Sequence, residues 1–189
     1  MLAVITGASS GIGKELAYKL AEKRYDLILI ARRIDRLDEI KNDLIKLNVN
    51  VEVYPLNLSD MTSLKSGIKY LENKNIDLFI NNAGYGIYGN SIDQDDGHEI
   101  NMIDLNIKAL HYLTKAMIKS MEKGKVVNIS SMAAFLPTPL LSSYAATKAY
   151  VYSYSMALRY ELIKNNIPIN VITVCPGPVK TEFADVAKA

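Results

Sequence analysis

The sequence has little of what several classes of protein require. It contains one cysteine, Cys175, so it cannot form an intramolecular disulfide or a cysteine-rich zinc site. Its two histidines, His98 and His111, have no nearby cysteine and no paired spacing, so we expect no structural metal. The 22 basic and 20 acidic residues leave a net charge of +2 without any basic block, which argues against nucleic acid as a partner.

Long hydrophobic runs are also missing. The longest, such as residues 27–31, are far shorter than the roughly 20 residues that a membrane span needs. The apolar residues 2–5 follow no basic segment and run directly into a glycine- and serine-rich turn, so they do not form a signal peptide. We therefore expect a cytoplasmic protein with no membrane partner.

The residues that are present predict one compact domain over 1–189. The chain is 49% hydrophobic and 22% charged, which is typical of a globular protein with a core. Short apolar runs bounded by Gly, Pro, Asn or Asp predict six strands, at residues 2–5, 27–31, 51–54, 78–80, 126–129 and 169–174. Most are continuously apolar, as parallel strands covered on both faces are.

Helical patterns lie between these strands. Apolar residues at helical spacing are Ile12, Leu16 and Leu20; Leu37, Ile40, Leu44 and Leu47; and Met61, Leu64, Ile68 and Leu71, the last group after a possible cap at Ser59 or Asp60. Residues 101–121 and 142–164 are long enough for two more helices, and residues 84–97 and 135–143 read as loops. The alternation predicts an α/β fold, a doubly wound parallel sheet of the Rossmann type with helices on both faces.

The first turn carries the first chemical signal. Residues 6–13 read Thr-Gly-Ala-Ser-Ser-Gly-Ile-Gly, between the first strand and the first helix. Glycines let the backbone approach a ligand closely, and a helix N-terminus offers free N–H groups to a pyrophosphate. The turn predicts a nucleotide site, with a glycine-rich turn that binds nothing as the alternative. Its candidate residues are Gly7, Ser9, Ser10, Gly11, Ile12 and Gly13.

Two arginines end the second predicted strand. In dinucleotide-binding sheets an acidic residue there holds the ribose 2′-hydroxyl, but this chain has Arg32 and Arg33. A guanidinium pairs well with a phosphate, and Ser9 can add a hydroxyl, so the sequence favours NADP over NAD. Asp35 lies close by and weakens this preference, and two solvated arginines remain the alternative.

A tyrosine and a lysine form the second signal. Tyr144 and Lys148 are four residues apart, on one face of a predicted helix. A tyrosine has an ordinary pKa of about 10, and a nearby ammonium lowers it. Lowering the pKa to about 7, where proton transfer is efficient, takes about 4 kcal/mol, which an ammonium and an oxidised nicotinamide together could supply. Because the chain has 12 tyrosines, an ordinary helix face is the alternative.

The motifs occur in a definite order. They are residues 6–13, Asn81-Asn82-Ala83-Gly84, Asn106, Ser131, Tyr144, Lys148 and Cys175-Pro176-Gly177. In this order and spacing the whole chain resembles the short-chain dehydrogenase/reductase family. The resemblance implies that Tyr144 is the acid in carbonyl reduction and the base in alcohol oxidation, and that Lys148 lowers its pKa and holds the nicotinamide ribose. It implies that Ser131 binds the substrate oxygen and stabilises the developing alkoxide.

The resemblance implies further roles. Asn106 would bind a water that connects Lys148 to solvent. The thirteen-residue spacing to Tyr144 favours Ser131 over Ser130, which is left with a structural role. The remaining cofactor contacts would be Asn57 and Leu58 at the adenine edge, Asn82, Ala83 and Gly84 beside the adenosine and its ribose, Pro176, Gly177 and Val179 along the nicotinamide, and Thr181 near its amide or the pyrophosphate.

Two departures from the family stand out. Asn57 replaces a frequent Asp, although an amide can still donate and accept at that place. The chain also stops at Ala189, soon after Thr181, where family members usually continue with a substrate-covering loop, a seventh strand and a last helix. Either the substrate lid is missing and the sixth strand is an exposed edge, or the sequence omits a tail.

The sequence thus predicts an NADP-dependent oxidoreductase that moves a hydride between the cofactor and a carbonyl or secondary alcohol. Apolar residues of the two loops predict a fairly apolar substrate: Tyr85, Ile87, Tyr88, Phe135, Leu136, Leu140 and Leu141. A homodimer or homotetramer is implied around the two long helices, where Ala145, Ala149, Tyr152, Met156 and Tyr160 form either that face or part of the core. The rivals are a non-catalytic dinucleotide-binding module and a nucleotide-sugar epimerase, whose glycine spacing and length fit less well.

Overall fold

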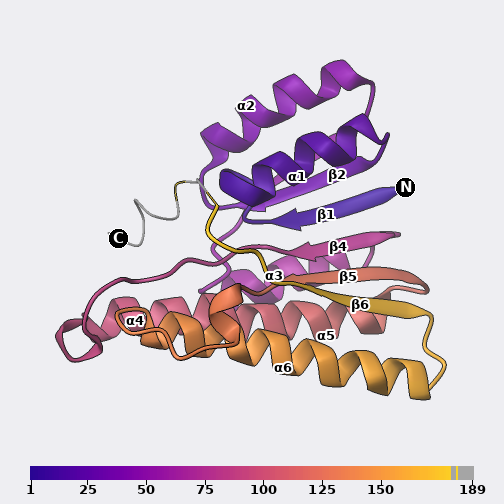
Figure 1. Ribbon diagram of the computed structural model, residues 1–189. Helices are drawn as coiled ribbons and strands as arrows, with labels where there is room; N and C mark the ends of the chain where they lie inside the picture. The colour runs from indigo at the N-terminus through magenta and orange to yellow at the C-terminus, as the bar shows by residue number, and fades with distance from the viewer. Residues whose placement is uncertain (180–181, 183–189) are drawn as a thin grey trace.

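A six-stranded parallel sheet organises the chain. The computed structural model describes residues 1–179 and 182. The strands are β1 (Leu2–Thr6), β2 (Asp26–Ala31), β3 (Val51–Pro55), β4 (Leu78–Asn81), β5 (Gly124–Ile129) and β6 (Ile169–Val174). They lie in the order β3-β2-β1-β4-β5-β6, which confirms the predicted Rossmann-type sheet (Figure 1). All six predicted runs are strands, and five of them extend one or two residues further than the apolar pattern alone.

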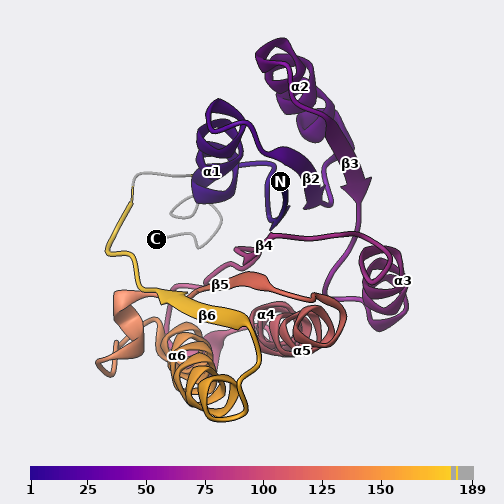
Figure 2. The same ribbon diagram turned by 90° about the vertical axis from the view of Figure 1, so that its right-hand side faces the viewer.

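Helices cover the sheet on both faces. They are α1 (Gly11–Glu22), α2 (Ile34–Leu44), α3 (Met61–Leu71), α4 (Asp96–Ile103), α5 (Leu110–Ser120) and α6 (Ser142–Lys164), with short 3-10 segments η1 (Ile45–Leu47), η2 (Ser91–Asp93) and η4 (Met132–Ala134). Figure 2 shows α1 and α2 on one face and α3, α5 and α6 on the other. Each face has its own apolar core, one around Ile5 and Leu29, the other around Val4 and Phe79.

The packing of α1 differs from its apolar pattern. Ile12, Leu16 and Leu20 are only half-buried, whereas the fully buried face consists of Gly13, Ala17 and Ala21. Small residues let the helix lie close to the first turn, because a side chain at Gly13 would come within 2.4 Å of the Gly7 carbonyl oxygen. The hydrophobic periodicity predicted this helix correctly. It did not predict the buried face, which consists of the smallest residues because the helix packs closely against the first turn.

The predicted long helix over 101–121 is interrupted. Helix α4 begins earlier, at Asp96, and passes into a π-helical segment, η3 (Asp104–Ala109), before α5 begins at Leu110. A π-helical turn adds a residue to the helical repeat and redirects side chains. Here the segment carries Asn106, which is 1% exposed and points toward the loop after β4.

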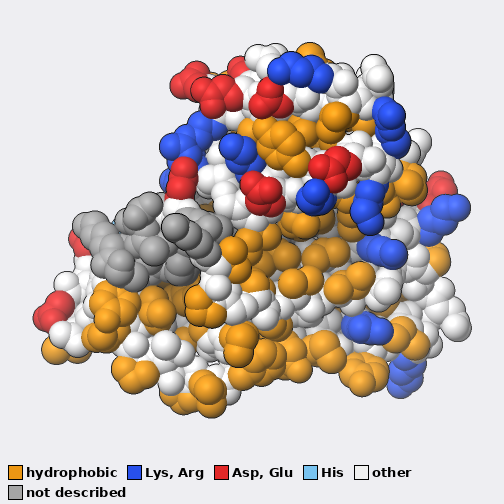
Figure 3. All heavy atoms as spheres, turned by 45° about the horizontal axis from the view of Figure 1, so that its top comes forward, with side chains coloured by type: hydrophobic (Ala, Val, Ile, Leu, Met, Phe, Trp, Pro, Cys, Tyr) orange, Lys and Arg blue, Asp and Glu red, His pale blue; other side chains and the backbone are white. Residues whose placement is uncertain are grey.

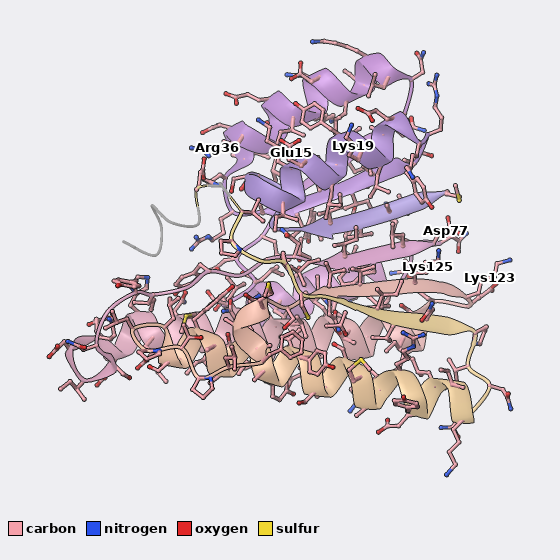
Figure 4. The ribbon with its side chains drawn as sticks, in the orientation of Figure 1. Glu15, Lys19, Arg36, Asp77, Lys123 and Lys125 are labelled. Carbon is pink, nitrogen blue, oxygen red and sulfur yellow. The ribbon has the colours of Figure 1, made fainter. Side chains whose placement is uncertain are left out.

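One face of the sheet is partly bare in the described part of the chain. On the side of α1, Figure 2 shows no described helix over β5 and β6, and β6 forms the sheet edge. Leu78, Val127 and Ile172 are partly exposed there. Figure 3 shows hydrophobic side chains gathered on this side, and Figure 4 shows Lys123 and Lys125 pointing to solvent near its margin.

A buried polar network crosses the other face. Asn81 on β4 donates to Thr114 Oγ1 (2.9 Å) and to Asn128 Oδ1 (2.9 Å) on the neighbouring strand β5. Asn128 Nδ2 in turn donates to Ser155 Oγ on α6 (2.9 Å). All four side chains are at most 3% exposed, so these bonds set how α5 and α6 sit on the sheet.

Candidate active site and cofactor cleft

A cleft opens at the carboxyl ends of the strands. The strand order reverses between β1 and β4, which is where open α/β sheets bind ligands. The cleft measures about 420 Å³. Twelve residues of the predicted cofactor set line it: Gly7, Ser9, Ser10, Gly11, Ile12, Arg32, Arg33, Asn57, Leu58, Asn82, Ala83 and Gly84. The predicted nucleotide-binding residues of four separate turns therefore come together.

The first turn has the shape that a phosphate cradle needs. Gly7 and Gly11 have φ angles of +67° and +53°, which favour glycine. Ser10 precedes α1 but makes no capping bond to it, so its hydroxyl leaves the first amides of the helix available. Asn82 Nδ2 donates to the Thr6 (3.0 Å) and Gly7 (3.2 Å) carbonyls, which ties the turn after β4 to this one. The uncapped helix start fits a pyrophosphate.

Arg32 and Arg33 differ in the contacts that their side chains make. Arg33 donates to Ser9 Oγ (3.1 Å) and Ser10 Oγ (2.8 Å) and pairs with Glu182 (3.1 Å). Arg36, labelled in Figure 4, also pairs with Glu182, and both guanidinium groups lower the pKa of that carboxyl. Arg32 lines the cleft but makes no side-chain hydrogen bond with the described residues. The basic cluster is therefore Arg33 with Arg36, and the sequence analysis missed Arg36 and Glu182.

A hydrogen-bonded series runs along the other wall of the cleft. Asn57 Oδ1 accepts from Ser59 Oγ (2.9 Å), which accepts from Asn101 Nδ2 (2.9 Å). Asn101 Oδ1 accepts from the Tyr85 hydroxyl (3.1 Å). Ser59, His98, Asn101 and Leu105 also line the cleft without having been predicted, and for the last three the reason is that only the fold brings α4 and η3 there. The side-chain amide nitrogen of Asn57 therefore has no hydrogen-bond partner among the described residues.

Tyr144 and Lys148 lie together in the interior. Both are under 10% exposed, and Lys148 Nζ is 5.7 Å from the centroid of the Tyr144 ring. Lys148 Nζ donates to the Ile129 carbonyl at the end of β5 (3.0 Å), and the Ser131 side chain lies close enough to Tyr144 to lower its pKa. The Tyr144 ring packs with Tyr85 and Met102. The three predicted side chains thus meet where β5 ends and α6 begins.

Burial is the main influence on the pKa values of Tyr144 and Lys148. It raises the pKa of Tyr144, and the hydrogen bond from Ser131 opposes that rise. It lowers the pKa of Lys148 to about 8. Lys148 is not among the groups that shift the pKa of Tyr144 here, and its lowering by the ammonium together with an oxidised nicotinamide stays a prediction.

Asn106 makes three side-chain hydrogen bonds to protein groups. Its Oδ1 accepts from the Tyr85 amide (3.1 Å), and its Nδ2 donates to the Tyr85 carbonyl (2.8 Å) and to Thr147 Oγ1 (3.1 Å). A side chain at Gly84 would come within 2.9 Å of Asn106 Oδ1. Asn106 therefore fixes the loop after β4 against the turn of α6 that precedes Lys148.

The segment after β6 lies beside Ser131. The Pro176 carbonyl accepts from the Met132 amide (3.0 Å), and Gly177 lies against the Met132 sulfur. Val179 is half-exposed. Pro176, Gly177 and Val179 do not line the cofactor cleft, and Thr181 lies outside the described residues.

The predicted apolar substrate residues divide into two groups. Tyr85, Ile87 and Leu141 pack with Tyr144. Phe135 and Leu136 instead line a separate apolar hollow of about 550 Å³, with Ala145 and Ala149 of α6. Tyr88 and Leu140 are exposed. The first group thus forms an apolar surface around the Tyr144 cluster.

Neither a metal cluster nor a membrane span is found in the described part of the chain. Over residues 1–179 and 182, His, Cys, Asp and Glu nowhere gather in a group of three or more that could hold a metal ion. Over the same residues, each helix is too short or too polar to cross a membrane.

The close approach of α1 to the first turn yields a stability prediction. Gly13→Ala should destabilise the protein by about 1–3 kcal/mol, because the new methyl group would overlap the Gly7 carbonyl and Asn82 Nδ2. Gly97→Ala is the matched control, since the nearest atom lies 3.4 Å away and alanine favours a helix. Urea unfolding should show a lower midpoint for the first variant and an equal or higher one for the second. Equal midpoints would contradict the close packing.

Comparison with known proteins agrees with this geometry. The family model described as short chain dehydrogenase matches residues 1–189. An NADP-dependent 3-hydroxy acid dehydrogenase of Schizosaccharomyces pombe is 36% identical over 189 residues, covering 96% of this chain and 72% of the relative. A very-long-chain 3-oxoacyl-CoA reductase of Rattus norvegicus is 34% identical over 198 residues, covering 98% of this chain and 62% of the relative.

Solved structures agree as well. A short-chain dehydrogenase from Sphingobium yanoikuyae in complex with NADPH has a TM-score of 0.92 at 35% identity, covering 99% of this chain and 74% of the other. A short-chain dehydrogenase/reductase from Burkholderia phymatum in complex with NAD has a TM-score of 0.91 at 25% identity. The match covers 100% of this chain and 69% of the other. This chain spans about three fifths of three of its curated relatives (60%, 62% and 58%). The chain belongs to the short-chain dehydrogenase/reductase family.

Proposed function

We propose that this protein is a cytoplasmic oxidoreductase that transfers a hydride between NADP(H) and a carbonyl or secondary alcohol. The observation that carries the proposal is the placement of the buried Tyr144 and Lys148 beside the partly exposed Ser131 at the carboxyl edge of the sheet, which also bears the cleft. Gly7, Gly11 and the start of α1 would hold the pyrophosphate, and Arg33 with Ser9 and Ser10 the 2′-phosphate. The bound cofactor supplies the hydride.

The protein groups orient the substrate and move a proton. Ser131 donates a hydrogen bond to the substrate oxygen and stabilises the charge that develops there. Tyr144 gives its hydroxyl proton to that oxygen in reduction and takes it back in oxidation. Lys148 provides the positive charge that favours the phenolate form of Tyr144, and the oxidised nicotinamide adds to it. Asn106 holds the adjoining loop and Thr147 in place, so that these side chains stay aligned.

The substrate class follows from the wall beside Tyr144. Tyr85, Ile87 and Leu141 offer an apolar surface to the substrate. The rat relative, by its name, acts on very-long-chain acyl substrates, which supports a fairly apolar carbonyl compound. We further propose a homodimer or homotetramer around α5 and α6, because Tyr152 and Met156 are partly exposed on α6 and Tyr160 is 68% exposed.

Replacing the phenol tests the chemistry. Tyr144→Phe removes only the hydroxyl and keeps the ring against Met102 and Tyr85, so NADPH affinity should change less than threefold while kcat falls by about 10²–10⁴. Spectrophotometric NADPH oxidation with a panel of ketones and aldehydes, beside NADPH titration, measures both. A Tyr144→Phe variant that retains turnover would overturn the proposed role of the phenol. A wild-type chain that binds NADPH and turns over no substrate in the panel would instead favour a non-catalytic binding module.

The pKa of Lys148 sets a pH dependence. Because burial lowers that pKa to about 8, the ammonium persists below pH 8 and is lost above it. Without the ammonium the phenolate of Tyr144 is less stabilised, so kcat for ketone reduction should fall as pH rises through about 8. Rates from pH 6 to 10 with saturating NADPH measure the profile. A flat profile up to pH 10 would show that this lysine does not control the reaction.

The preference for NADP rests on Arg33. Its guanidinium already bridges Ser9 and Ser10, and a charge-assisted bond to phosphate is worth roughly 1.5–3 kcal/mol. Arg33→Ala should therefore weaken NADPH binding about tenfold or more and leave NADH binding nearly unchanged. Arg32→Ala, the neighbouring control, should have a smaller effect. Calorimetric titration of each variant with NADPH and with NADH measures these affinities. Equal losses of affinity for NADPH and NADH would argue for NAD as the cofactor.

A further inference from the structure

Two consecutive residues at the end of β5 each form a hydrogen bond with Lys148. Its ammonium Nζ donates to the Ile129 carbonyl oxygen (3.0 Å). Its backbone carbonyl oxygen accepts from Ser130 Oγ (2.7 Å). Ser130 and Lys148 are 2% and 6% exposed, so both bonds are shielded from water. The two bonds close a ring between the strand end and one turn of α6.

We propose that Ser130 is a positioning residue of the proposed reaction: its hydroxyl sets how close α6 lies to the end of β5, so that the Lys148 ammonium stays anchored on Ile129 and within reach of Tyr144. The inference rests on the proposed function.

The Ser130 bond is not needed to satisfy Lys148. The Lys148 carbonyl lies within α6, where a helical carbonyl accepts from the amide four residues later. Losing the Ser130 hydroxyl would therefore leave no buried carbonyl without a partner. What the second bond adds is a fixed backbone position for Lys148, because a bond at the far end of a long side chain with many rotamers does not fix the backbone by itself.

Position matters because the ammonium is buried. Removal from water disfavours its charged form, and the Ile129 carbonyl is the described group that its Nζ bonds. The titratable groups that face Lys148 are Tyr144 on α6 and Cys175 after β6. From the other side Asn106 and Gly84 approach it, and neither titrates. A shift of α6 away from β5 would lengthen the anchoring bond and destabilise the charged lysine.

Ser155 provides a matched control on the same helix. It lies seven residues after Lys148, is fully buried and is also bonded to β5, since Asn128 Nδ2 donates to its hydroxyl (2.9 Å). Ser155→Ala removes the one hydrogen bond that Asn128 Nδ2 makes to a described group, and an unpartnered buried amide is costly. Ser130→Ala leaves no such group at Lys148. The two variants should therefore separate stability from chemistry.

The test compares Ser130→Ala, Ser155→Ala and Tyr144→Phe in the full chain, with NADPH and a ketone that the wild type reduces. Ser130→Ala should lower kcat about tenfold, keep the ketone KM within twofold, and move the alkaline limb of the rate profile down by about half a pH unit, because the charged lysine is less stabilised. Ser155→Ala should keep kcat within twofold and the same alkaline limb, yet unfold at a lower urea concentration than Ser130→Ala.

The outcomes distinguish this inference from the proposed function. If Tyr144→Phe abolishes turnover while Ser130→Ala keeps the wild-type kcat and alkaline limb, the positioning role is wrong and the proposed function stands. Equal kinetic losses in both serine variants, or a Ser130→Ala chain that does not fold, would also overturn it, because the bond would then serve stability alone. Turnover that persists in Tyr144→Phe would overturn the proposed function itself.

Discussion

The buried ammonium of Lys148 is the constraint on which the site depends. A charge this far from water is tolerated only where hydrogen-bond acceptors are fixed around it, and the end of β5 provides one in the Ile129 carbonyl. Of the next two residues, Ser130 bonds to the backbone of Lys148, and Ser131 lies close enough to Tyr144 to lower its pKa. Three consecutive residues at one strand end thus lie against the lysine and the tyrosine of α6, which is why the proposed chemistry is assigned to this junction. The sheet and the helix need not move for the group to be assembled.

The cofactor cleft depends on a different kind of contact, between turns. The turn after β4 reaches back to the first turn through Asn82 and Thr6, and glycines at 7 and 13 leave room for that approach. Asn106 continues the connection from the loop after β4 to α6. The glycine turn, the loop after β4 and the turn of α6 before Lys148 are therefore parts of one hydrogen-bonded frame, and a displacement of any of them would be felt at the others.

Much of the fold was predictable because most strands are covered on both faces. A doubly covered strand is largely apolar, so the apolar runs located all six strands, and their alternation with helices implied the parallel sheet. The helices were less predictable in detail. The buried face of α1 consists of glycine and alanine, which no hydrophobic pattern marks, and the π-helical segment that carries Asn106 interrupts a run that reads as one helix. Both exceptions occur where backbone segments approach one another closely.

By itself, the sequence determined which chemical groups the protein has and in what order: the glycine turn, Arg33, Ser131, Tyr144 and Lys148, at spacings that already imply one family. The tertiary structure alone decided which of them cooperate. It turned Arg33 rather than Arg32 toward the two serines, added Glu182 and Asn101 to the cleft, moved Phe135 and Leu136 to a separate hollow, and made burial the main influence on the pKa of Tyr144. The reason is that direction, burial and distance arise from packing between segments far apart in the chain, and no local pattern of residues contains that information.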